Sequence, residues 1–170
     1  MPGWKQKVEE LFGARVTASP PASDEDIADL TDWLGADLPG DLAEILKETN
    51  GVCDSDQDWV WLVASAEEMQ SDTEELREDE AEIYLDDNTW EEVQADPDLK
   101  EEYADHISFD HYLFISAWHG TGDRYALLLK PAADTPAGHI VHWKRETATF
   151  TPFAQNLDDY LTKMRSLVGD

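Results

Sequence analysis

The stretch YLFISAWHGTGDRYALLLK, residues 112–130, decides the fold class of this chain. Two runs rich in aromatic and aliphatic residues, 112–118 and 125–130, flank a glycine-containing turn. This pattern predicts two antiparallel strands joined by a tight turn, with Gly122 at positive φ. We expect a third strand at 139–144 and a fourth at 147–150, so that the region 109–150 forms an antiparallel meander.

The segments on both sides of this meander have the periodicity of amphipathic helices. Before it, helices are expected at 4–12, at 24–34 behind a Ser23 cap, and from Pro39 to about 49. A strand is expected at 59–63, and a capping box at 65–68 starts another helix. A last helix is expected from Phe153 onward. The pattern predicts one α+β domain over residues 1–170, with a single antiparallel sheet flanked by N-terminal and C-terminal helices.

Composition favours a folded protein of the reduced cytoplasm. The chain has 170 residues, 41% of them hydrophobic, and seven tryptophans, which is too apolar for a disordered segment. Its one cysteine, Cys53, excludes an intrachain disulfide. The N-terminus shows no secretory signal, and no apolar run is long enough to span a membrane. We therefore expect a cytoplasmic protein, whose oligomeric state the sequence leaves open.

The net charge of -27 is the dominant compositional fact. Between residues 65 and 105 there are 18 acids and two bases, so -16 of that charge falls within 41 residues. Such a chain should be repelled by nucleic acid and anionic membranes, and it should attract basic proteins. Solubility and salt adaptation are the alternatives, although salt adaptation predicts a more even spread of charge.

No residue pattern points to a metal, a cofactor or catalysis. The run Asp54, Asp56 and Asp58 resembles the start of a calcium loop, but Trp59 and Ser65 occupy positions that need glycine and glutamate. The five histidines do not converge in sequence, and Cys53 lies among acids that blunt a thiol. We expect no metal, no cofactor and no enzyme activity, with an enzyme whose site is not visible as the remaining alternative.

The order of several short motifs resembles the SUKH superfamily of Smi/Knr-type proteins. These motifs are Leu38-Pro39-Gly40-Asp41, Thr49-Asn50-Gly51, Phe114-Ile115-Ser116, Tyr125-Ala126-Leu127 and Gly138-His139-Ile140-Val141 followed by Trp143. The resemblance covers most of residues 24–167. It implies the α+β fold expected above. Residues 79–105, interpreted as an acidic insertion, and Trp118-His119 before the turn depart from the family pattern. The resemblance also implies a function, because bacterial members are typically immunity proteins that neutralise a toxin, often a nuclease.

The favoured hypothesis is an immunity protein that binds a cognate toxin, a basic nuclease, through its acidic surface. The alternative is a regulatory interaction module of the same fold without a toxin partner. Trp90 and Tyr103 are candidate aromatic anchors, since aromatic residues are enriched among interface hot spots, and core packing is the competing interpretation for both. The candidate acidic residues are Asp54, Asp56, Asp58, Glu74, Glu75, Glu78, Asp79, Asp86 and Asp87.

Overall fold

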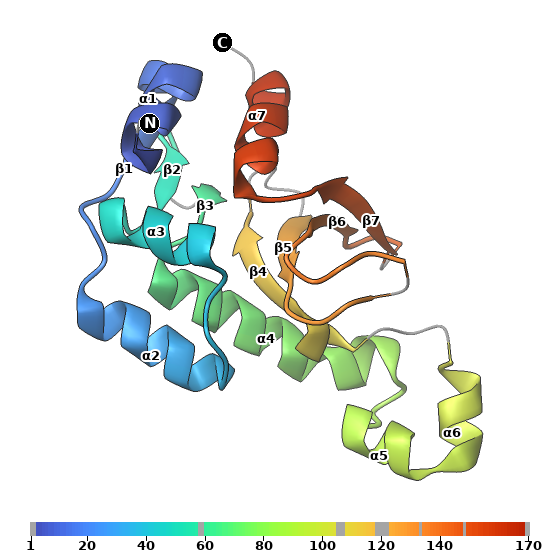
Figure 1. Ribbon diagram of the computed structural model, residues 1–170. Coiled ribbons are helices and arrows are strands. Elements are labelled where there is room, and N and C mark those ends of the chain that lie inside the picture. The colour runs from blue at the N-terminus through green and yellow to red at the C-terminus, as the bar shows by residue number, and fades with distance from the viewer. Residues whose placement is uncertain are drawn as a thin grey trace.

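A computed structural model describes residues 3–57, 60–104, 108–117, 123–132, 134–147 and 149–168 (Figure 1). The helices are α1 (Trp4–Phe12), α2 (Asp24–Leu34), α3 (Gly40–Glu48), α4 (Ala66–Tyr84), α5 (Trp90–Ala95), α6 (Pro97–Glu102) and α7 (Leu157–Val168), with short 3-10 turns η1 (Gly13–Arg15) and η2 (Phe109–His111). The strands are β1 (Val16–Ala18), β2 (Val52–Asp54), β3 (Trp61–Val63), β4 (Tyr112–Ser116), β5 (Arg124–Leu128), β6 (Ile140–Lys144) and β7 (Thr149–Ala154). The chain is therefore α+β, as its sequence predicts.

The serine caps expected for two helices are confirmed. Ser23 and Asp26 form a reciprocal capping box at the start of α2, and Gly35 ends that helix at φ +69°. Ser65 accepts a hydrogen bond from the Glu68 N–H, so α4 begins where expected. The capping box expected there is incomplete, however, because no reciprocal bond joins the Glu68 carboxylate to the Ser65 N–H in the described part of the chain.

The expectation of a single sheet is wrong: the strands form two antiparallel sheets, ordered β1-β2-β3 and β4-β5-β6-β7. Strands β1 and β2 have three residues each, too few for an alternating pattern to reveal them. The sheets meet where the Ala117 N–H donates to the Trp61 carbonyl at 3.1 Å and the Ala64 N–H donates to the Ile115 carbonyl at 2.7 Å. Strand β3 thus lies along β4 at the edge of the larger sheet. The two strands are joined by these isolated hydrogen bonds and not by a regular series.

The larger sheet is the predicted meander, with every neighbouring pair antiparallel. Its last strand, β7, begins two residues later and ends four residues later than the sequence indicates. The expected helix start at Phe153 is therefore wrong, because Phe153 lies within β7 and α7 begins at Leu157. The expected turn glycine, Gly122, lies outside the described residues, as do Asp58, Trp59 and Trp118.

Side chains of the meander alternate between two hydrophobic clusters on opposite faces. Leu113, Ile115, Tyr125 and Leu127 enter the first cluster, which α1, α3 and α7 complete. Tyr112, Phe114, Ala126 and Leu128 enter the second, with Trp143 and Phe109. Helix α4 runs along β4 and contributes to both, so the period-two pattern of the strands buries both faces.

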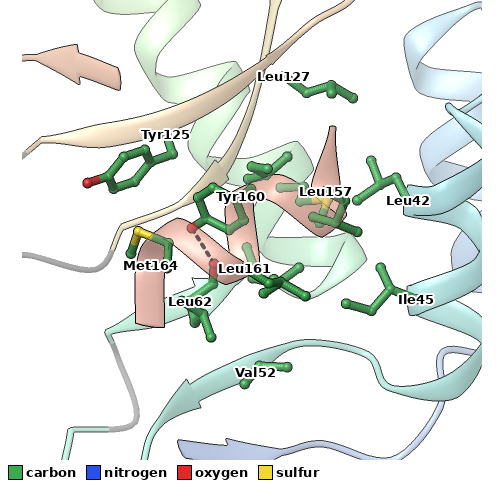
Figure 2. Close-up of a cluster of buried hydrophobic side chains, with 14 of the residues drawn as sticks. Leu42, Ile45, Val52, Leu62, Tyr125, Leu127, Leu157, Tyr160, Leu161 and Met164 are labelled. Atoms are coloured by element: carbon green, nitrogen blue, oxygen red, sulfur yellow. Dashed lines mark hydrogen bonds between the residues drawn. The ribbon is translucent and has the colours of Figure 1, made fainter. Parts of the chain in front are cut away.

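Helix α7 packs its inner stripe into the first cluster (Figure 2). Leu157, Leu161 and Met164 share this cluster with residues of α3 and the strands, and Tyr160 is fully buried among them. The Tyr160 hydroxyl donates to the Leu62 carbonyl at 2.7 Å, which satisfies a polar group that would otherwise be unfavourable in the core. This bond connects the last helix to the small sheet.

The segment 79–105 finishes α4 and then forms α5 and α6. The sequence suggests short helical turns there, opened by Thr89 and by Asp96-Pro97, and both are present. The two helices pack on each other beyond the end of α4 (Figure 1). Within the described residues, no helix has the length and apolar character needed to cross a bilayer.

Candidate partner-binding surface

The loop after β2 holds three of the predicted acids, and the structure gives the first a different role. Asp54 is 6% exposed, and its carboxylate accepts the N–H groups of Asp56 and Gln57 at 2.7 and 3.1 Å. Arg15 lies 3.6 Å from the same carboxylate. Asp54 therefore shapes the loop from inside, and its prediction as a partner-facing residue is wrong. Asp56 is exposed, and Asp58 lies outside the described residues.

Helix α4 separates its side chains into an inner and an outer face. Thr73 and Glu80 are buried on the inner face. The Thr73 hydroxyl accepts the Phe114 N–H at 3.0 Å, and the Glu80 carboxylate accepts the Phe109 N–H at 2.8 Å. This register turns Glu74, Glu75 and Glu78 to solvent and leaves Asp79 half-buried, so the structure brings these four predicted acids onto one helix.

An arginine inside this acidic helix fixes the position of the helix, a role that is not evident from the sequence. Arg77 donates to the Phe109 and Tyr112 carbonyls at 3.4 and 3.3 Å, and its guanidinium lies 5.0 Å from the ring centroid of Trp33. Burial lowers the pKa of Arg77, while nearby Asp110 and Glu80 act in the opposite direction. The sequence feature that could have indicated this role is the isolation of Arg77 among many acids, since such a positive charge is often bound by specific partners.

The turn after α4 places Asp86 and Asp87 on the surface. Both have positive φ, at 50° and 65°, a conformation that aspartate tolerates better than most residues. The Asp87 N–H donates to the Ala81 carbonyl at 2.7 Å, which closes the end of α4. The exposed carboxylates of this turn therefore sit on a backbone that α4 itself constrains.

Tyr103 meets Asp86 although the two are distant in sequence. The Tyr103 hydroxyl donates to the Asp86 carboxylate at 2.5 Å, and this bond raises the pKa of Tyr103 to about 12. The contact joins the end of α6 to the turn after α4. Two of the predicted site residues are thus brought together, with Tyr103 half-buried.

Trp90 begins α5, where it is half-buried. Thr89 and Glu92 form a reciprocal capping box around it, so the position of the indole is set by a well-capped helix. Its role as an interface anchor stays a prediction. Within the described residues, no group of three or more histidine, cysteine, aspartate or glutamate side chains is arranged to hold a metal.

The short motifs of the N-terminal half have structural roles of their own. Asp41 accepts the Leu42 N–H at 2.9 Å and the Leu157 N–H at 3.1 Å, so one carboxylate serves the starts of α3 and α7. Asn50 accepts the Ala66 N–H at 2.9 Å and so contacts the start of α4. Gly51 has φ +106°, and a Cβ there would lie 2.7 Å from the Trp61 ring. These residues hold the N-terminal helices against the rest of the fold.

The sequence model of the SMI1 / KNR4 family (SUKH-1) matches residues 21–163. The chain belongs to this family. The match begins just before α2, ends inside α7, and includes all of the acidic segment. A comparison with curated proteins found no match. The SUKH-1 assignment agrees with the observed mixture of helices and antiparallel sheet and with the resemblance drawn from the motifs.

Proposed function

We propose that this SUKH-1 protein is an immunity protein that binds and neutralises a cognate toxin, a basic enzyme of the nuclease type. The observation that carries the proposal is the accumulation of exposed carboxylates along α4 and the α5–α6 pair of a family member with a net charge of -27. We define the α4–α6 acidic surface as Glu74, Glu75, Glu78, Asp79, Asp86, Asp87, Trp90 and Tyr103. Asp56 belongs to a separate exposed loop.

A basic partner follows from the charge. Nucleases bind phosphate backbones and therefore concentrate lysine and arginine at their active sites. A negatively charged protein surface can occupy such a cleft and is attracted to it over long range. Inhibition by occupation requires no catalytic residue, so we propose a binding protein and not an enzyme.

The fixed positions of the residues in the α4–α6 acidic surface support this proposal. Its carboxylates lie on a helix anchored by Arg77 and Glu80, and on a turn held by Tyr103. Groups that are already fixed lose less conformational entropy on binding, which favours tight association. Trp90 and Tyr103 add aromatic area beside the charges.

The test takes the product of the gene beside this chain's own as the candidate toxin. We expect stoichiometric amounts of the chain to abolish the toxin's nuclease activity, and the association rate to fall steeply with added salt. The variant Glu74→Gln, Glu75→Gln, Glu78→Gln, Asp79→Asn should associate at least about tenfold more slowly at low salt, because steering accelerates association by orders of magnitude.

The matched control makes the same charge change elsewhere on the molecule. Glu9→Gln, Glu10→Gln, Glu146→Gln, Asp134→Asn alters four exposed acids outside α4–α6, and it should slow association far less. Equal slowing in both variants would show that only net charge matters. Binding without inhibition of any toxin would favour a regulatory interaction module instead.

A further inference from the structure

A pocket lies at the opposite end of α4 from the α5–α6 pair, where the two sheets meet. It has a volume of about 350 Å³, within the range of ligand-binding pockets. Its walls come from β3, the first turns of α4, the end of β4 and the start of β5. The side chains that matter are Trp61, Glu68, Asp72, Ser116 and Arg124, which combine one aromatic ring with two carboxylates and one cation.

Arg124 and Asp72 already satisfy each other. The Arg124 Nε and Nη2 atoms donate to the two oxygens of Asp72 at 2.8 and 3.3 Å, and each side chain is 22% exposed. This two-pronged geometry is the strong arrangement for an arginine and a carboxylate. It leaves Glu68 as the second carboxylate of the pocket.

Glu68 departs from the pattern that its position sets elsewhere in this protein. It is the third residue of α4, behind a serine cap. The corresponding residues of α2 and α5, Asp26 and Glu92, turn back to accept the N–H of their cap residue. Glu68 makes no such bond, and no ion pair in the described chain includes it; its side chain is exposed at the rim of the pocket.

The pair with Arg124 compensates the charge of Asp72, so Glu68 carries the uncompensated negative charge of the pocket. A cation could bind between Glu68 and the Trp61 ring. It would gain a charge-assisted hydrogen bond and a cation–π contact together.

We propose that this pocket receives an arginine side chain of the basic partner, with its guanidinium between Trp61 and Glu68. Arginine fits because its planar group stacks on aromatic rings and pairs with carboxylates through two hydrogen bonds. The inference rests on the proposed function for the identity of the partner. The recognition itself depends only on pocket residues, so it can be tested without the toxin.

The test titrates the full chain with N-acetyl-arginine amide, followed by NMR of the tryptophan indole N–H groups. Trp61 is assigned from the spectrum of Trp61→Phe. We expect saturable shifts of the Trp61 signal, and about two- to fivefold weaker binding to Glu68→Gln, because this substitution removes an ion pair at an exposed carboxylate. N-acetyl-citrulline amide, which has the same shape without the charge, should bind at least as weakly.

Glu67→Gln is the matched control. Glu67 is exposed, as Glu68 is, and precedes it on the first turn of α4, but it does not line the pocket. It should bind the arginine probe as the wild type does. Equal weakening in both variants, or equal binding of the citrulline probe, would overturn the proposal. Saturable, Glu68-dependent binding in a protein that neutralises no toxin would refute the proposed function and leave the pocket assignment standing.

Discussion

At the residue scale, a shift of two positions decides whether a charged side chain is buried in the fold or exposed to a binding partner. Asp54 and Asp56 are two residues apart in one loop, yet the first is buried against backbone N–H groups and the second is exposed. Neighbouring Glu78 and Glu80 on α4 differ in the same way. Because buried carboxylates need partners, their environment and not their identity sets their role.

Gly51 offers a test at this scale. We expect Gly51→Ala to lower the free energy of unfolding by about 1–3 kcal/mol, because alanine is strained at φ +106° and its Cβ would overlap the Trp61 ring and approach the Ser65 nitrogen. Urea denaturation measures the change. Gly40→Ala is the control: nothing lies within 4 Å of a Cβ there, and the residue begins α3, so stability should be unchanged or higher. Equal effects at both positions would contradict this account.

At the element scale, α4 joins the acidic surface to the core. Its inner face reaches the backbone of β4 and η2 through Thr73, Arg77 and Glu80. Its outer face carries the exposed acids, and its first turns line the pocket with Glu68 and Asp72. One helix thus presents both proposed binding regions from a rigid support, as preorganised recognition requires.

The attachment of α4 can be broken at one residue. We expect Glu80→Ala to destabilise the fold by about 1–3 kcal/mol, because it leaves the buried Phe109 N–H without its carboxylate acceptor beside Arg77. Thermal and urea denaturation measure this loss. Glu78→Ala, two residues away and exposed, should change stability by less than about 0.5 kcal/mol. A loss of the same size from Glu78→Ala would show that α4 is held by its charge pattern instead.

At the scale of the whole molecule, a net charge of -27 works against compactness. The charge is tolerated because the hydrophobic clusters cover both faces of the larger sheet, and because Lys7, Arg15, Arg124 and Lys163 each pair with an acid. Self-repulsion remains among the acids of α4 to α6. A basic partner would remove it on binding.

This balance predicts a stabilising effect of salt. We expect the free energy of unfolding to rise between about 0.02 and 0.5 M sodium chloride, because screening weakens repulsion between exposed acids more than it weakens the partly buried ion pairs. The Glu74→Gln, Glu75→Gln, Glu78→Gln, Asp79→Asn variant should be at least as stable as the wild type at low salt and less responsive to salt. Urea denaturation at each salt concentration measures both; a fall in stability with salt would show that attractive pairs dominate.

The sequence by itself determined the α+β class, the serine caps of α2 and α4, and the antiparallel meander, because these depend on short-range periodicity, turn residues and side chains three or four positions apart. It also located the charge of the acidic segment. The family motifs are visible in the sequence. The hydrogen bonds by which their residues hold α7 and α4 could not be predicted from it.

Tertiary structure alone decided which of the candidate binding residues are exposed to a partner. The division into two sheets, the burial of Asp54, the Tyr103–Asp86 bond and the pocket around Glu68 join residues that are not local in sequence, or depend on what packs around them. A short strand such as β2 forms only because partners from other parts of the chain complete its hydrogen bonds. Burial is likewise set by the packing of distant segments, and a local pattern carries no record of it.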